Sequence, residues 1–353
     1  MKTNNIIRFF FIFLFVVPAF PLFGQEGNGH GETEDKFNAS KFILEHIADS
    51  HEWHILTKAN GESVAFYLPV ILYSKEKGLD IFSSKKLAHG HEYKGYRLEE
   101  EGDLQGRIVS VNESGEADTE HLPLDMSMTK AVMGLLFSAI IGLLLFISLA
   151  VSYRKTGISH PKGLQRFLEP VILFVRDDIA IPNIGEHKYE RYMPYLLSAF
   201  FFILINNLMG LIPFPPPFGA NVTGNIAVTF VLATFTFLIT QFSGNKGHWR
   251  HVFATPGVPF WLLPIMIPVE IIGLFSKPFA LMIRLFANIT AGHIIVLSLI
   301  SLIFIFNSVA LAPVSMFFVI FMDFMELLVA FLQAYIFTLL SALFISLAVQ
   351  ENH

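Results

Sequence analysis

Apolar positions dominate the chain from residue 129 onward, whereas the segment before it mixes apolar and polar residues. Three apolar stretches come close to the ~20 residues that an α-helix needs to cross the hydrocarbon core of a bilayer. They are Thr129–Ser152, Met193–Pro213 and Val222–Phe242. Two longer stretches follow, Val258–Phe306 and Val309–Val349. The pattern therefore predicts five membrane-spanning helices.

The last two stretches are longer than one crossing requires. A helix of roughly 40 residues extends about 60 Å, whereas the hydrocarbon core is about 30 Å thick. Each stretch is therefore either broken or strongly tilted. Pro264, Pro268 and Pro278 could break the first of them, but the second has only Pro313, near its start. A pair of long tilted helices is credible on this basis.

Basic residues indicate how the spans are oriented. They are Arg154, Lys155, Lys162 and Arg166 after the first span, and Lys246 and Arg250 after the third. Because cytoplasmic loops carry an excess of Lys and Arg, these loops are predicted to be cytoplasmic, with the preceding domain outside and the C-terminus inside. The intervening segment Gly163–Ile181 mixes apolar and charged residues, which predicts a helix on the cytoplasmic membrane surface.

The N-terminal segment is predicted to hold a signal peptide and a small exported domain. Lys2 and Arg8 precede a short, proline-interrupted apolar run, so residues 1–24 fit a cleaved signal peptide, with an uncleaved anchor as the alternative. Residues 25–125 then form a periplasmic α+β domain. One helix and three strands are expected in it, at Phe42–Leu56, Ser63–Ser74, Gly78–Ser84 and Gly106–Ser114.

Composition agrees with a membrane protein and excludes several kinds of site. Of 353 residues, 53% are hydrophobic and only 15% are charged, far from the balance of an ordinary soluble domain. The net charge of −5 and the scattered Lys and Arg do not indicate a nucleic-acid partner. The absence of cysteine excludes disulfides and thiolate metal ligands.

Six histidines between residues 30 and 91 lack a spacing that fixes ligands to one helical face. They are His30, His46, His51, His54, His89 and His91. Solvated or packed histidines explain them better than a metal does, so neither a metal nor another cofactor is expected.

A few ionisable residues interrupt the two long apolar stretches. Glu270, Lys277 and Arg284 repeat every seven residues, nearly two helical turns, and Asn288 continues the same polar stripe. His293 follows Arg284 by nine residues, which places it about 180° around an ideal helix. A charge at the centre of a membrane helix costs about 2.5 to 3.5 kcal/mol on insertion scales, so these residues are predicted to be functional.

The last stretch repeats the seven-residue spacing. Glu326 and Gln333 stand seven residues apart there, and Asp323 precedes Glu326 by three. Asp323 has no clear assignment at this stage, and Lys277 could simply extend its ammonium to the membrane surface.

Two segments carry a resemblance to a known family. The motif "SKPFALMIRLFANITAGH", followed by "LLVAFLQAYIFTLLSALFISLA", closely resembles the two C-terminal helices of subunit a of F-type ATP synthases. The likeness extends upstream through "NNLMGLIP" and "NVTGNIAVTF" and covers roughly Thr129 to the end. The longer N-terminal segment departs from the usual family pattern, and the resemblance says nothing about its role.

The resemblance implies an all-α polytopic membrane domain over residues 126–353, preceded by the small extracytoplasmic α+β domain. It implies five transmembrane helices, the last two long, tilted and curved around the ring of c subunits. The expected protein is the proton-translocating stator subunit of a bacterial inner-membrane ATP synthase, itself non-catalytic. Its expected partners are the c-subunit ring, the b-subunit peripheral stalk, the rest of the complex and the lipid bilayer.

By the same resemblance, Arg284 faces a rotor carboxylate and separates two aqueous half-channels. A guanidinium keeps its charge in proteins, so it favours the ionised carboxylate and blocks direct proton passage. The alternative is a structural cation paired with Glu270. His293, Glu326, Asn288 and Gln333 are expected to line the periplasmic half-channel.

Glu270 and Lys277 are expected near the cytoplasmic exit. Many bacterial relatives have the carboxylate at the position of His293 and the histidine at that of Glu326. The reciprocal exchange indicates a pair, for which a packed contact without proton transfer is the alternative. For Gln333 and Asn288 the competing interpretation is hydrogen bonding between helices.

Two other functional classes remain open. An ion-coupled secondary transporter also buries charges, but no self-similar halves are visible. An intramembrane enzyme needs a motif such as H-E-x-x-H, which is absent, and "HWRH" at His248–His251 is predicted to sit in a loop without an acidic neighbour. Co-purification with a carboxylate-bearing ring distinguishes the stator from both. The coupling ion and the size of the ring are not encoded in this chain.

Overall fold

The computed structural model describes residues 39–57, 63–75, 77–99, 102, 104–112, 116–118, 121–156, 163–212, 215–253, 259–306 and 308–349. The predicted signal peptide at residues 1–24 lies outside them. The chain divides into two compact units. The first is drawn from Met1–Gly134 with Ile212–Ala220, and the second from Leu135–Leu211 with Asn221–His353.

The first unit contains one helix and three small antiparallel sheets. The helix is α2 (Ala39–Ile47). The sheets pair β1 with β2, β3 with both β4 and β8, and β6 with both β5 and β7. The strands are β1 (Glu52–Thr57), β2 (Ser63–Tyr67), β3 (Pro69–Ser74), β4 (Gly78–Ser83), β5 (Tyr96–Leu98), β6 (Ile108–Val111), β7 (Ala117–Asp118) and β8 (Leu124–Asp125). Two short 3₁₀ turns, Ser84–Lys86 and Ala88–Gly90, follow β4.

Two of the predicted N-terminal elements are wrong in extent. The expected helix Phe42–Leu56 ends at Ile47, and its second half is strand β1. The expected strand Ser63–Ser74 is two strands separated at Leu68. Pro69 has no backbone donor for a ladder, which explains why the first pairing stops and a new sheet begins there. The predicted strands at residues 78–84 and 106–114 are confirmed in part as β4 and β6.

A small core and several polar contacts hold this unit together. Its apolar residues are Val70, Leu72, Phe82, Leu87, Tyr96 and Ile108. His51 Nε2 lies 3.4 Å from Asp125 Oδ2. Burial opposes ionisation of Asp125, but interactions with His51 and Ser127 outweigh it and hold the pKa of that carboxyl below its usual value. His51 therefore has a carboxylate partner rather than a metal-binding cluster among the described residues.

The first unit also supplies the start of the first long helix. Asp49 Oδ1 accepts a 3.0 Å hydrogen bond from Ala131 N, and Ser50 O accepts one of 3.0 Å from Lys130 N. These two acceptors satisfy backbone donors that a helix N-terminus leaves open.

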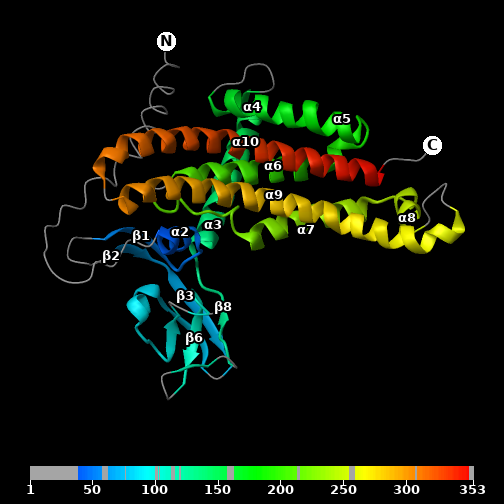
Figure 1. Ribbon diagram of the computed structural model, residues 1–353. Coiled ribbons are helices and arrows are strands. Elements are labelled where there is room, and N and C mark those ends of the chain that lie inside the picture. Colours follow the sequence, from blue (N-terminus) through cyan, green and yellow to red (C-terminus); the bar gives the residue numbers. More distant parts are fainter. Residues whose placement is uncertain are drawn as a thin grey trace, which may run out of the picture. The chain divides into compact units, whose positions relative to one another are not determined.

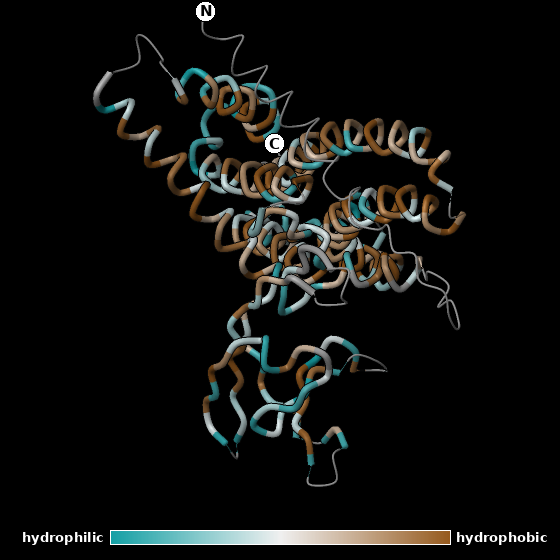
Figure 2. The backbone as a smooth tube through the Cα atoms, turned by 90° about the vertical axis from the view of Figure 1, so that its left-hand side faces the viewer, coloured by the Kyte–Doolittle hydropathy of each residue, from teal (hydrophilic) through white to brown (hydrophobic). Residues whose placement is uncertain are grey.

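The second unit is helical, and five helices in the described part of the chain are long and apolar enough to cross a membrane. They are α3 (Lys130–Thr156), α6 (Tyr189–Leu211), α7 (Ile226–Ser243), α9 (Leu263–Ile305) and α10 (Ala312–Val349). Figure 2 shows apolar residues predominating along the long helices. All five predicted spans are confirmed as helices.

Shorter helices connect these spans. The predicted surface helix is confirmed as a helical segment, composed of α4 (Leu164–Phe174), a π-helical stretch at Val175–Ala180 and α5 (Ile181–Ile184). Helix α8 (Lys246–Phe253) joins α7 to α9, and 3₁₀ turns at Phe260–Leu262 and Val309–Leu311 precede α9 and α10.

Helices α9 and α10 are unbroken and run antiparallel, side by side (Figure 1). Their register is given by three contacts. Ser315 Oγ donates to Leu299 O, His293 meets Glu326, and the Lys277 ammonium lies 5.7 Å from the centre of the Phe344 ring. Pro268 and Pro278 lie inside α9 without ending it. Of the two possibilities left by their length, the unbroken helix is therefore the correct one, and its tilt stays a prediction.

Small residues explain how α10 packs against α6. Buried positions recur at every fourth residue on one face of α10, and they are Ala330, Ala334, Thr338, Ala342 and Ser346. Small side chains let membrane helices approach closely, because lipid gives apolar side chains no reason to prefer protein. We call this face the small-residue face of α10. Ala334 and Ala342 of this face share a buried core with Leu196, Phe200 and Ile203 of α6, and α10 packs against α6.

Candidate functional site

Arg284 lies on a bare face of α9. Its side chain is exposed, and it makes no hydrogen bond or ion pair with any residue that the structure describes. The large side chains of Phe279 and Ile283 beside it are also exposed. The opposite face carries Leu281 and Leu285, which are buried in the helical core. The charge is therefore presented outward from an apolar surface, without a counter-ion among the residues that the structure describes.

The other polar residues predicted to share a stripe with Arg284 on α9 differ in their exposure. Lys277 and Asn288 are exposed, whereas Glu270 is partly buried. Glu270 does not pair with Arg284 and instead lies nearest to His251 on α8. The alternative in which Glu270 neutralises Arg284 therefore has no support in the contacts of α9.

His293 and Glu326 meet across the α9–α10 interface. His293 Nδ1 lies 3.6 Å from Glu326 Oε2, and the two side chains are 20% and 13% exposed. The structure thus brings together the two residues predicted from the sequence to form a pair. The other carboxylate oxygen, Glu326 Oε1, is buried without a hydrogen-bond partner among the described residues. We call these two residues the enclosed pair.

Gly292 makes room for the enclosed pair. A Cβ atom at this position would come within 2.9 Å of Glu326 Cδ and closer still to Oε1. Real Cβ atoms essentially never approach a neighbour so closely, so the carboxylate occupies the space that a side chain at residue 292 would fill. Asp323, one turn before Glu326 on α10, is partly buried.

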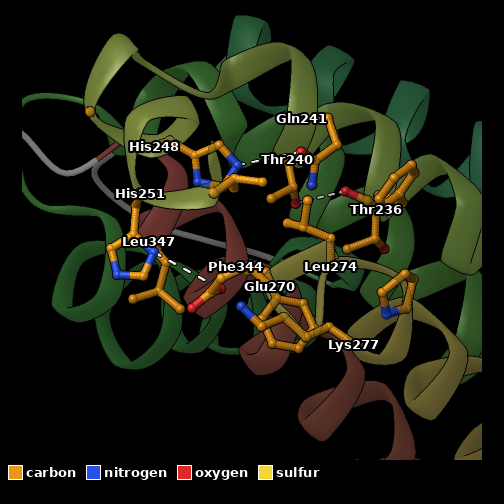
Figure 3. A pocket seen from close by; sticks show the side chains of 14 residues that line it. Thr236, Thr240, Gln241, His248, His251, Glu270, Leu274, Lys277, Phe344 and Leu347 are labelled. Atoms are coloured by element: carbon orange, nitrogen blue, oxygen red, sulfur yellow. Dashed lines mark hydrogen bonds and ion pairs between the residues drawn. The ribbon is translucent and has the colours of Figure 1, made fainter. Parts of the chain in front are cut away.

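A second polar group lines a cleft of about 230 Å³ between α7, α8, α9 and α10 (Figure 3). Its polar side chains are Thr236, Thr240 and Gln241 of α7, His248 and His251 of α8, and Glu270 and Lys277 of α9. His251 Nδ1 lies 4.0 Å from Glu270 Oε2, and these side chains are 53% and 30% exposed. We call His251 and Glu270 the open pair.

The interpretation of "HWRH" as a loop without an acidic neighbour is wrong. His248 and His251 lie on helix α8, and Glu270 approaches His251 from α9. The error arises because nineteen residues separate the histidine from the acid, and no periodicity links two different helices.

The two histidines of α8 have different surroundings. His248 Nε2 lies 3.3 Å from Gln241 Oε1, and its backbone N–H donates to Asn245 Oδ1. Burial, followed by the electrostatic influence of Lys277 and His251, lowers the pKa of His248. His248 therefore favours its neutral form and acts as a hydrogen-bonded part of the cleft wall.

Gln333 is buried on α10, in contrast to Asn288 on the bare face of α9. The structure therefore does not place these two predicted channel amides in one common environment. Neither amide side chain makes a hydrogen bond with another residue that the structure describes.

Sequence reasoning missed two polar networks between the helices. Asn207 Nδ2 donates to Ala330 O at 3.2 Å, and Asn207 Oδ1 accepts from Thr223 Oγ1 at 2.6 Å, so a buried amide ties α6 to α10. The Tyr195 hydroxyl lies 2.5 Å from Thr236 Oγ1, which is 3.3 Å from Ser341 Oγ. The available signal was the threonine spacing on α7, where Thr229, Thr236 and Thr240 share one buried face.

Comparison with known proteins gives a family match over most of the helical part. A family model described as the ATP synthase A chain matches residues 133–346. A second model, described as a domain of unknown function (DUF8433), matches residues 42–130. The boundary between the two matches falls at the start of α3.

Curated proteins similar to this chain are named as ATP synthase subunit a. ATP synthase subunit a of Chloroherpeton thalassium is 50% identical over 244 residues, 66% of this chain and 72% of that protein. ATP synthase subunit a 2 of Chlorobium luteolum is 44% identical over 312 residues, 84% and 89% of the two chains. ATP synthase subunit a of Anaeromyxobacter is 41% identical over 339 residues, 93% and 75% of the two chains.

Proposed function

Since the chain belongs to the ATP synthase A chain family, we propose that it is the proton-translocating stator subunit of an F-type ATP synthase, in which Arg284 separates two half-channels. Residues 126–353 form the membrane part that faces a ring of c subunits. Coupled proton flow past this surface drives rotation and ATP synthesis elsewhere in the complex. The chain itself carries no catalytic site in this proposal.

The observation that carries the proposal is the bare, unpaired guanidinium of Arg284. A charge within a spanning helix costs about 2.5 to 3.5 kcal/mol on insertion scales, and such residues normally find a partner inside their own protein. Arg284 has none among the described residues. A rotor carboxylate that moves past α9 supplies the missing negative charge, and the permanent cation favours its ionised form.

The two polar pairs support separate entry and exit paths. The enclosed pair lies toward the α9–α10 turn, and the open pair lies toward the start of α9. Histidine and carboxylate side chains exchange protons near neutral pH. His293, Glu326, Gln333 and Asn288 therefore serve proton uptake from the periplasm, and Glu270 with Lys277 serves release on the cytoplasmic side.

Orientation and location follow from the basic loops. Lys246 and Arg250 lie on α8, beside the open pair, and cytoplasmic loops are rich in such residues. The C-terminus is then cytoplasmic in the bacterial inner membrane. The domain at residues 25–125 is periplasmic and follows a cleaved signal peptide at residues 1–24. A b-subunit stalk holds the subunit against rotation.

The decisive experiment replaces Arg284 in the complete complex reconstituted in vesicles. Arg284→Ala should lower ATP synthesis and ATP-driven proton pumping by at least about 100-fold, the factor that corresponds to a ~2.7 kcal/mol charge interaction. Arg284→Lys should fail as well, because an ammonium lacks the planar fork and can lose its proton when buried. Arg166→Ala, which removes an exposed cation from α4, is the matched control and should remain active.

Assembly and passive proton conductance are measured on the same preparations. The proposal requires normal subunit content with lost coupling in the Arg284 variants. A normally assembled Arg284→Ala complex that makes ATP at the wild-type rate would contradict it. A secondary transporter, the second functional class, would instead move its substrate without a carboxylate-bearing ring, and the bare Arg284 does not favour it.

A further inference from the structure

We propose that His251 is an additional proton-carrying residue, which passes protons between Glu270 and the water outside the α7–α8–α9–α10 cleft. This inference rests on the proposed function and extends its release path by one residue. It assigns a role to helix α8, on which His251 lies.

The geometry provides a short route from the α9 stripe to solvent. His251 Nδ1 and Glu270 Oε2 are 4.0 Å apart, a gap that a small side-chain movement or one bridging water closes. Glu270 is the more enclosed of the two, and His251 the more exposed. Figure 3 shows both side chains directed toward each other across the mouth of the cleft.

Among the described residues that line the cleft or lie on α8, no other group offers the same path. Helix α7 contributes the neutral Thr240 and Gln241, and α10 contributes Phe344 and Leu347. On α9, Lys277 is a cation that cannot accept a proton while charged. On α8 itself, Lys246 and Arg250 are exposed cations, and His248 is held in its neutral form beside Gln241.

The proton step is balanced. Protonated Glu270 loses its O–H proton to the neutral ring of His251, which leaves a carboxylate beside an imidazolium ion. The new ion pair limits the cost of separating the charges. The imidazolium then loses a proton to bulk water and returns to the neutral ring, while Glu270 accepts the next proton from the rotor side. No oxidant or other reactant is needed.

The test uses the complete complex in vesicles, with His251→Ala and His251→Gln compared with His248→Gln. Replacing His251 should slow ATP synthesis about fivefold, less than the ~10²–10⁴ of a fully sequestered acid–base group, because water reaches the cleft. The rate of ATP synthesis should also lose the part of its pH dependence that reflects protonation of a histidine. Added imidazole should raise the rate of ATP synthesis by the His251→Ala complex. The His248→Gln complex should keep the wild-type pH profile, and imidazole should not change its rate.

Several results would overturn the inference. They are a wild-type rate and pH profile in both His251 variants, a slow rate that imidazole leaves unchanged, or an imidazole response confined to the His248 variant. An Arg284→Ala sample in the same assay separates the two proposals. If that variant is inactive while the His251 variants behave as wild type, only the role of His251 fails. If Arg284→Ala remains active, the stator function itself fails.

Discussion

The enclosed pair and the open pair use the same two residue types in opposite surroundings. His293 and Glu326 are 20% and 13% exposed and lie 3.6 Å apart between two packed helices. His251 and Glu270 are 53% and 30% exposed and lie 4.0 Å apart at the mouth of a cleft. The open pair is therefore more accessible to water than the enclosed pair. Although both pairs consist of a histidine and a glutamate, substitutions in the enclosed pair are therefore expected to slow proton transfer more than substitutions in the open pair.

Arg284 lies between these pairs along α9. At 1.5 Å of rise per residue, it is about 21 Å from Glu270 and about 14 Å from His293 along the helix axis. Neither histidine–carboxylate pair neutralises it. The Arg284 charge is therefore separate from both pairs.

The largest effect in this comparison is expected at the enclosed pair. His293→Ala should slow proton uptake by about 10²-fold or more and shift its pH dependence, because an acid–base group in a site with little water has no substitute. Exchanging the two residue types should restore more activity than either single change retains, since the residues act as a unit. Proton uptake in vesicles measures both. Additive losses without recovery would favour a packed contact that transfers no proton.

Gly292 allows a finer test without removing a titratable group. Gly292→Ala should displace the Glu326 carboxylate and slow uptake about tenfold, below the ~10² that a 1 Å misplacement can cost. Stability should change little, because the better helix propensity of alanine, about 1 kcal/mol, opposes the cost of its close contact with Glu326. Gly273→Ala on the same helix is the matched control, since its added Cβ meets nothing within 4 Å. Equal rates for the two variants would show that the position of Glu326 is unimportant.

The smallest effect is expected at the open pair. Glu270→Gln should slow ATP synthesis by no more than about fivefold, because exposed ion pairs are worth about 0–1 kcal/mol and water can carry protons in the cleft. Glu326→Gln provides the comparison and should be the slower variant. A greater loss at Glu270 than at Glu326 would reverse the ranking of the two sites.

The membrane-spanning helices and the enclosed pair could both be predicted from the sequence, but on different grounds. Length and hydropathy determine a membrane helix almost alone, so α3, α6, α7, α9 and α10 were all predicted. Prolines were a weaker guide, because Pro268 and Pro278 lie inside an unbroken helix. The meeting of His293 with Glu326 was indicated by the family resemblance rather than by spacing.

The missed features depend on contacts between elements. His251 reaches Glu270 only because α8 folds against α9, and no local pattern specifies that packing. In the first unit, the division at Leu68 depends on Pro69, whose missing donor is a local signal that the alternating apolar pattern concealed. Asn207 belongs to the quoted "NNLMGLIP" segment, but its bond to Ala330 O requires the register of α6 against α10.

The small-residue face of α10 also has a mechanical consequence. Alanine side chains have no rotatable χ angle, and serine and threonine have short ones, so Ala330, Ala334, Thr338, Ala342 and Ser346 contribute few soft internal motions to the contact. Short side chains on one side of a contact deform less under a sideways load than long, flexible ones. Helix α9 is largely exposed on its outer face and packs against α10 on the other, so α10 supports it against bending. Under the proposed function, a sideways force on Arg284 would pass through α10 to α6 instead of bending α9 alone.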